Sequence, residues 1–140
     1  MSGHIPKFGY IGMTGDFIHI GHIRALRACS EKCRILIVGV MTDESVKKYK
    51  KHAPIMDMHT RAEVIKSIRY VKQVIFQDSF EYPHHLFCIK DFWGKDFVIF
   101  DSDEHQRAGA DIIIPRVKDI SSSLFRKAVN DDFDIGQCEI

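Results

Sequence analysis

No apolar run in this chain of 140 residues approaches the roughly 18 residues of a membrane-spanning helix, so we expect no membrane insertion. Charge of one sign is not in excess either. The 20 basic and 19 acidic side chains leave a formal net charge of +1, which gives no reason to expect a nucleic-acid partner. The N-terminus lacks the regions of a signal peptide, and we expect a cytoplasmic protein. Repeats, low-complexity segments and linkers are absent, which predicts a single domain over residues 1–140.

Cysteine is also scarce. Cys29 and Cys33 are four residues apart, but no second pair completes a zinc site, and Cys88 and Cys138 are isolated. We therefore expect reduced thiols at Cys29 and Cys33, one of them facing the core, rather than structural zinc.

What the chain contains is a regular alternation of apolar and amphipathic segments. Strands are predicted over residues 7–12, 34–41, 71–76, 97–100 and 111–114, and helices over residues 20–32, 58–70, 83–91 and 121–130. The expected core-facing helix residues are Ile23, Ala25, Leu26, Val64, Ile65 and Ile68. Residues 42–58 are polar and predict a loop with at most one helical turn, and residues 131–140 predict a loose acidic tail. This order predicts an α/β fold with a mainly parallel five-stranded sheet and right-handed connections.

Residues 14–22, Thr-Gly-Asp-Phe-Ile-His-Ile-Gly-His, lie between the first predicted strand and the first predicted helix; we call them the histidine turn. The free N–H groups and the dipole at a helix N-terminus attract anions. His19 and His22 stand at this terminus, where an imidazole N–H can donate to a phosphate oxygen. Ligands bind beyond the carboxyl ends of parallel strands, so the histidine turn predicts a phosphate site rather than two surface histidines.

A second polar segment, Asp-Ile-Ser-Ser-Ser at residues 119–123, precedes the last predicted helix. One serine is enough to cap a helix. With Arg116 and Arg126 nearby, the further hydroxyls would form a second anion site. A plain helix cap explains the same residues equally well.

A lysine cluster follows the second predicted strand, at the sheet edge where ligands bind. Its members are Lys47, Lys48, Lys50 and Lys51. A charge run is usually a solvated face, but a long loop at this edge can fold lysines over a polyphosphate. Arg61 and Arg69 are further candidates for this cluster, or surface charges.

Thr14, Asp16 and His19 to His22 match the His-x-Gly-His signature of the nucleotidyltransferase superfamily. Residues 36–44 resemble the second strand and following turn of the small cytidylyltransferases, and residues 61–71 resemble their helix and next strand. Residues 115–123 are similar to their second signature. Over residues 7–129 the chain thus resembles the small cytidylyltransferase family, with the glycerol-3-phosphate cytidylyltransferases as the most similar group.

The resemblance implies a Rossmann-like three-layer nucleotidyltransferase fold and a set of site residues. His19 and His22 would stabilise charge at the α-phosphate, Lys50 would act in catalysis and on the substrate phosphate, and Lys47 is a second candidate for that phosphate. The implied nucleotide contacts are Thr14, Gly15, His19, Ile20, Gly21, His22, Lys51, Arg69, Arg116, Ser121, Ser122 and Ser123.

The implied reaction moves CMP from CTP to a small phosphorylated alcohol of the glycerol 3-phosphate, phosphocholine or phosphoethanolamine type and releases pyrophosphate. A phosphate nucleophile already carries its charge, so positioning and electrostatic stabilisation should supply most of the rate. Mg²⁺ would bridge the phosphates, with Asp16 as the candidate protein contact. The resemblance also implies a homodimer.

This sequence departs from the family pattern at several positions, which cluster on the acceptor side. Gly15 replaces an aromatic residue, Lys72 replaces an acidic one, and residues 101–103 read Asp-Ser-Asp where Gly-Asp-Asp or Gly-Ser-Asp is common. Residues 82–85 read Tyr-Pro-His-His in the region of a substrate-binding lysine. The sequence therefore supports CTP chemistry better than it identifies the second substrate.

Three alternatives stand beside this prediction. An ATP-dependent adenylyltransferase of the same superfamily fits residues 121–126 equally well, although residues 38–44 and 69–71 favour the cytidylyl group. A non-catalytic nucleotide-binding module is the second, and the intact His19 and His22 argue against it. A phosphonate could replace the phosphate ester as acceptor.

Overall fold

The computed structural model describes residues 3–115. The predicted helix over residues 121–130, the predicted acidic tail and the proposed nucleotide contacts Arg116, Ser121, Ser122 and Ser123 lie outside the described residues.

Five parallel strands form a single sheet whose order is β3-β2-β1-β4-β5. The strands are β1 (Phe8–Met13), β2 (Ile35–Met41), β3 (Gln73–Gln77), β4 (Phe97–Ser102) and β5 (Ile112–Ile114). The helices are α1 (Ile20–Ser30), α2 (Asp43–Lys50), α3 (Met58–Lys66) and α4 (His84–Trp93), and a short helical turn, Gly94–Asp96, precedes β4. Since β2 and β4 flank β1 on opposite sides, the carboxyl end of β1 lies at the switch in strand order where ligands bind in such sheets.

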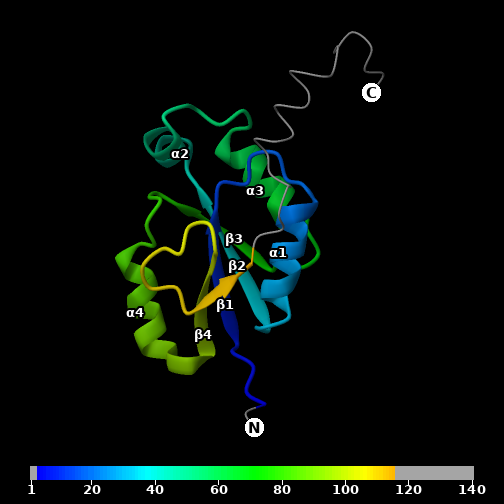
Figure 1. The fold of residues 1–140 in the computed structure, drawn as a ribbon, viewed down its shortest axis with the longest axis vertical. Helices are drawn as coiled ribbons and strands as arrows, with labels where there is room; N and C mark the ends of the chain where they lie inside the picture. The colour runs from blue at the N-terminus through cyan, green and yellow to red at the C-terminus, as the bar shows by residue number, and fades with distance from the viewer. Residues whose placement is uncertain (1–2, 116–140) are drawn as a thin grey trace.

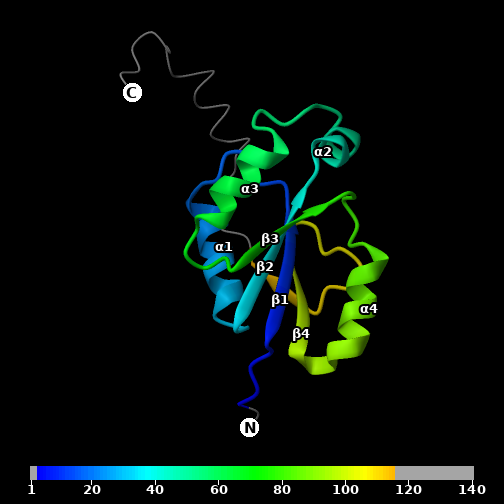
Figure 2. The ribbon, with the colours of Figure 1, turned by 180° about the vertical axis from the view of Figure 1, so that it is seen from behind.

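The sheet is the middle of three layers. α1 and α3 cover one face and α4 covers the other, while α2 stands beyond the carboxyl ends of the strands (Figure 1 and, from behind, Figure 2). One apolar core lies under α1 and α3 and includes Leu26 and Ile65, and a second lies under α4 and includes Leu86 and Ile99. The predicted α/β class with its parallel five-stranded sheet is confirmed.

The backbone of β2 comes unusually close to a buried side chain from β1. Tyr10 donates a 2.5 Å hydrogen bond to Gln77 Oε1, and its ring crosses over Gly39. A Cβ atom at Gly39 would lie 1.7 Å from the Tyr10 hydroxyl oxygen, so only glycine fits there. This contact fixes polar groups directly beneath the carboxyl edge of the sheet.

The structure corrects the prediction for residues 42–58, which contain the eight-residue helix α2 instead of a loop with at most one turn. Thr42 caps α2 by accepting a hydrogen bond from the Ser45 N–H (3.3 Å). Acidic residues in the first turn and lysines in the last turn both match the helix dipole. Capping and charge order thus favour a helix whose few apolar residues give almost no periodic signal.

α3 ends at Lys66, earlier than predicted, and the core contacts of this region are partly corrected. Ile65 is fully buried and Ile68 packs against the core, as expected. Val64 is 37% exposed, because it lies about 100° around the helix from Ile65.

Both Cys29 and Cys33 are buried in the core under α1 and α3, whereas only one of them is expected there from the sequence. They are free thiols. Burial raises the pKa of Cys29 to about 12 and that of Cys33 to about 11. Both cysteines therefore act as small apolar core residues.

Candidate active site

A cavity of about 600 Å³ opens at the carboxyl ends of β1 and β4. The histidine turn and the start of α1 form one wall, and the end of α2, the loop after β3 and the loop between β4 and β5 form the opposite wall. Seven residues predicted from the sequence line this cavity: Thr14, Gly15, Asp16, His19, Gly21, His22 and Lys50. The structure thus brings the histidine turn and one lysine of the cluster to a common space.

The two histidines cap α1 reciprocally. His19 is the N-cap residue, and its Nδ1 accepts a hydrogen bond from the Gly21 N–H (3.0 Å). His22 Nδ1 accepts one from the His19 N–H (3.2 Å), and the ring centroids are 4.1 Å apart. A nitrogen that accepts from a backbone N–H carries no proton, so each neutral ring has its proton on Nε2. The caps therefore leave one N–H donor on each imidazole.

Both imidazoles are held in the neutral form. Burial, followed by His19 and Lys50, lowers the pKa of His22 to about 4. Burial also lowers the pKa of His19. At neutral pH the two rings can therefore offer fixed, uncharged N–H donors, while Lys50 supplies positive charge nearby.

The histidine turn requires glycine at position 15. Gly15 has φ +72°, and a Cβ atom there would lie 2.5 Å from Ile65 Cδ1. An L side chain would be strained in this conformation and would also press on α3. The conformation and packing of this turn therefore require glycine at position 15, where the family usually has an aromatic residue.

Asp16 is buried and holds the chain before α3. One of its carboxylate oxygens accepts a hydrogen bond from the Ile55 N–H (2.8 Å) and the other from the Met56 N–H (3.1 Å). Asp16 thus joins the histidine turn to the segment between α2 and α3.

Arg61 is not a surface charge, which was one of its two predicted roles, because its side chain is fully buried. Its guanidinium donates to Met56 O (2.9 Å), to Thr14 O (2.6 Å) and to Asp43 Oδ1 (2.7 Å). Arg61 therefore ties α3 both to the histidine turn and to the first turn of α2. It does not line the cavity, so it positions the two walls rather than contacting a ligand there.

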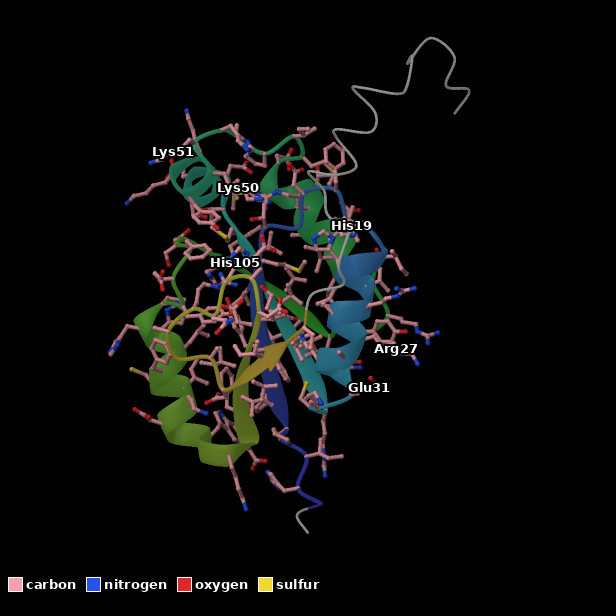
Figure 3. The ribbon with its side chains drawn as sticks, in the orientation of Figure 1. His19, Arg27, Glu31, Lys50, Lys51 and His105 are labelled. Atoms are coloured by element: carbon pink, nitrogen blue, oxygen red, sulfur yellow. The ribbon has the colours of Figure 1, made fainter. Side chains whose placement is uncertain are left out.

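The four residues of the lysine cluster do not all lie at the cavity. Lys50 lines the cavity, whereas Lys47, Lys48 and Lys51 do not. Lys51 is the C-cap residue of α2, and Figure 3 shows it farther from His19 than Lys50 is. The structure brings only Lys50 to the histidines.

Two other predicted nucleotide contacts do not reach the cavity. Ile20 begins α1, but its side chain is 46% exposed and lies outside the cavity wall. Arg69 lies between α3 and β3, at the amino edge of the sheet, with its guanidinium carbon 5.0 Å from the Tyr70 ring centroid. The cavity opens at the opposite edge, so the structure does not bring Arg69 to the two histidines, and its contact with the nucleotide stays a prediction.

A buried arginine beneath the cavity is not predicted from the sequence. Arg107 forms an ion pair with Asp101 (2.9 Å) and donates to Gly12 O (2.7 Å) and Phe80 O (2.8 Å). It thereby joins the ends of β1 and β4 to the loop after β3. Burial acts to raise the pKa of Asp101, but the hydrogen bonds and the charge of Arg107 outweigh it, so this pKa is lowered. Asp101 follows directly from a predicted strand at the ligand-binding edge, which was the available signal for this pair.

Three aromatic side chains on the opposite wall were also missed. The rings of Tyr49 and Phe80 are stacked, with centroids 4.0 Å apart and an interplanar angle of 12°. His105 meets both rings edge-on, at 5.3 Å from Phe80 and 6.2 Å from Tyr49. These residues come from three segments far apart in the sequence, so no local spacing pattern predicts that they come together.

Neither a ready-made metal cage nor a membrane segment is present in residues 3–115. That part of the chain has no group of three His, Cys, Asp or Glu side chains that could hold a metal ion. It also has no helix long and apolar enough to cross a membrane.

Residues 11–123 match the family model described as cytidylyltransferase-like, and the chain belongs to this family of nucleotidyltransferases. The match includes the histidine turn and every described residue of both cavity walls. It also extends through the serines at residues 121–123.

Curated relatives of several activities are similar to part of the chain. An FAD synthase of Pyrococcus abyssi is 42% identical over 71 residues, which are 51% of this chain and 48% of the relative. An ethanolamine-phosphate cytidylyltransferase of Arabidopsis thaliana is 37% identical over 73 residues, or 51% of this chain and 17% of the relative. A bifunctional protein HldE of Rhodopseudomonas palustris is 36% identical over 70 residues, or 49% of this chain and 14% of the relative. The matches thus span about half the length of the FAD synthase and less of the other two.

A solved structure supports the fold. The lipopolysaccharide core biosynthesis protein of Thermoplasma volcanium superposes with a TM-score of 0.61 at 17% identity, over 79% of this chain and 96% of that chain. At this identity the likeness concerns the fold alone.

Proposed function

We propose that this protein is a cytidylyltransferase that transfers CMP from CTP to the phosphate of a small phosphorylated alcohol. The observation that carries the proposal is the reciprocal capping of His19 and His22, which fixes two neutral N–H donors in the cavity that Lys50 also lines. Donors fixed before the reaction stabilise charge that develops in a transition state without further reorganisation.

In the proposed reaction, an oxygen of the acceptor phosphate attacks the α-phosphorus of CTP. A new P–O–P linkage forms, the bond from the α-phosphorus to the bridging oxygen breaks, and pyrophosphate leaves with the bonding electron pair. The attacking oxygen is already anionic, so no side chain has to remove a proton. His19 and His22 would donate to the α-phosphate, and the Lys50 ammonium would balance the charge of the two reacting groups.

The remaining nucleotide contacts stay part of the proposal. Thr14, Gly15 and Gly21 would approach CTP from the histidine turn. Outside the described residues, Arg116 with Ser121, Ser122 and Ser123 would hold the triphosphate. Buried polar partners that match cytosine would reject a purine, since each unpaired group costs about 1–3 kcal/mol.

Mg²⁺ fits this site as an ion carried mainly by the nucleotide phosphates. Mg²⁺ usually keeps several waters and takes one or two protein carboxylates besides phosphates. Asp16 lines the cavity with a carboxylate, which is the ligand type that Mg²⁺ takes from proteins. When bound, the ion would supply charge neutralisation at the phosphates. We also propose a homodimer and a cytoplasmic location, on the family resemblance and the sequence.

A second candidate is adenylyl transfer from ATP. The observation that favours it is the 42% identity to an FAD synthase, because FAD contains an adenylate joined to a flavin phosphate. The family model and the ethanolamine-phosphate cytidylyltransferase favour CTP. The two candidates share the phosphate chemistry and differ in the base and the acceptor.

A pyrophosphate-release screen separates these candidates. CTP and ATP, each with Mg²⁺, are tested against glycerol 3-phosphate, phosphocholine, phosphoethanolamine, aminoethylphosphonate and FMN. We expect turnover with CTP and a phosphorylated alcohol, and calorimetric binding of CTP at least about tenfold tighter than ATP, from one mismatch of 1.4 kcal/mol. Turnover with ATP and FMN, or equal affinity for both nucleotides, contradicts the cytidylyl proposal in favour of adenylyl transfer.

A further inference from the structure

The opposite wall of the cavity holds a histidine whose position is fixed by a compact loop. The N–H groups of His105 and Gln106 both donate to Ser102 O, at 3.2 Å and 3.0 Å. The next residue, Arg107, is anchored by its ion pair with the buried Asp101 (2.9 Å). The loop between β4 and β5 therefore presents His105 at the cavity from a rigid base.

Aromatic neighbours fix the plane of the His105 ring. Phe80 and Tyr49 lie edge-on to it, with interplanar angles of 85° and 78°. Arg107 covers Phe80 at 4.9 Å, while Tyr49 is 39% exposed. The imidazole nitrogens of His105 are thus held in a fixed plane, on a wall whose other polar residues at the cavity include Ser102, Glu104 and Arg107.

Lys50 lies within electrostatic reach of both walls. Burial, followed by His19 and then Lys50, lowers the pKa of His22. Burial, followed by Arg107, lowers the pKa of His105, whereas Glu104 and Asp101 raise it, and Lys50 adds a smaller lowering. Figure 3 shows the same arrangement, with Lys50 and His105 across from His19.

We propose that Lys50, His105 and the Tyr49–Phe80 stack form the acceptor subsite, which takes the phosphate group of a phosphate monoester. This inference rests on the proposed nucleotidyl transfer and adds the residues that select the second substrate. Lys50 and an imidazole N–H of His105 bind the acceptor phosphate, and the organic group of the monoester lies along the exposed Tyr49 ring.

The direction of the reaction explains why the acceptor occupies this wall. The attacking and leaving oxygens lie roughly in line through the α-phosphorus. With the α-phosphate held at the histidine turn, the attacking phosphate has to approach from across the cavity, where Lys50 and His105 stand. Lys50 thus contacts the reacting phosphate from each substrate. The new bond joins an oxygen of the acceptor phosphate to the α-phosphorus as pyrophosphate departs with its electron pair.

Inorganic phosphate is a probe of this subsite that does not depend on the identity of the acceptor. It is titrated into the full chain saturated with CMP, which occupies the nucleotide side without reacting, and histidine ring protons are followed by NMR. We expect the His105 resonance to shift, and His105→Ala to weaken phosphate binding about tenfold to a hundredfold, because one hydrogen bond to a charged group is lost. His105→Gln retains an N–H donor and should recover part of the affinity. His59→Ala is the matched control, since His59 is exposed and lies outside the cavity.

Steady-state kinetics with phosphoethanolamine and with glycerol 3-phosphate provide the second readout. We expect His105→Ala to raise the KM of the acceptor by a similar factor, while the KM of CTP changes by less than about twofold. A rise in the KM of CTP instead, or unchanged phosphate binding in His105→Ala, overturns the subsite. If the wild-type protein turns over none of the acceptors, the proposed function fails, and the phosphate titration still decides whether the subsite exists.

Discussion

The two walls of the cavity are built in different ways. The histidine wall is one continuous stretch, residues 14–22, in which a helix start and two side chains position each other through local hydrogen bonds. The opposite wall brings Tyr49, Phe80 and His105 together from three segments. Beneath them, Arg107 donates a hydrogen bond to Phe80 O and so holds the loop after β3. Residues in one continuous motif depend on one another, so such a motif suits chemistry that is common to a family. Residues of a wall assembled from separate segments can be substituted one at a time. Differences in acceptor are therefore expected on the assembled wall.

The largest effect is expected from removing Arg61, which joins the histidine turn to α2 and α3. We expect Arg61→Met to lower the free energy of unfolding by about 3 kcal/mol, because two backbone carbonyls and Asp43 lose a buried charged donor. Urea denaturation measures this loss. Asp43→Asn is the matched control and should cost about 1 kcal/mol or less, since Asp43 is 41% exposed. Equal losses in the two variants would show that the ion pair alone, and not the link to Thr14, matters.

Substitutions in the histidine wall separate its structural role from its catalytic one. We expect His19→Ala and His22→Ala each to reduce kcat about a hundredfold, as for loss of one oxyanion-type donor. His19→Asn and His22→Gln keep an acceptor suited to their cap positions, so they should retain stability while kcat stays low. Rapid-quench kinetics beside thermal denaturation make this comparison. Near-normal turnover in either alanine variant removes the histidines from the mechanism.

Substitutions in the lysine cluster allow a lysine that lines the cavity to be compared with neighbouring lysines that do not. We expect Lys50→Ala to lower kcat/KM at least about tenfold, because a charged donor to phosphate is lost. Lys51→Ala and the control Lys48→Ala should change it by less than about twofold, as is usual at the surface. A larger effect of Lys51→Ala than of Lys50→Ala would restore the sequence-based role of Lys51 at the nucleotide.

The last expected effect is a pH dependence of the folding stability to which His22 contributes. In the unfolded chain His22 binds a proton below its ordinary pKa of 6.5, but in the folded chain only near 4. The unfolded state therefore binds more protons in this interval, and stability should fall by about 1 kcal/mol per pH unit as the pH decreases from 6.5 towards 4. Denaturation curves across this range should show a shallower slope for His22→Gln. An unchanged slope would mean that other groups dominate.

The sequence predicts the local wall better than the assembled one. Strand periodicity and the glycine-bearing turn are local signals, and they are sufficient to predict the parallel sheet and the positions of His19 and His22 at its edge. Helix α2 has few apolar residues and depends on its cap and charge order, so periodicity misses it. Arg61 is ambiguous in the sequence, since burial of a charge depends on partners 18 and 47 residues away. No local pattern predicts His105 as a site residue, because the rings that position it, Tyr49 and Phe80, are distant in the sequence.

The most direct test of the central claim is phosphorus NMR of CTP incubated with Mg²⁺, the protein and phosphoethanolamine or glycerol 3-phosphate. We expect the α-phosphorus of CTP to appear in a new diphosphate diester in step with pyrophosphate, and this conversion to slow about a hundredfold in His19→Asn although the variant is folded. Release of inorganic phosphate without the diester, or diester formation at an undiminished rate in His19→Asn, would contradict nucleotidyl transfer at the histidine turn.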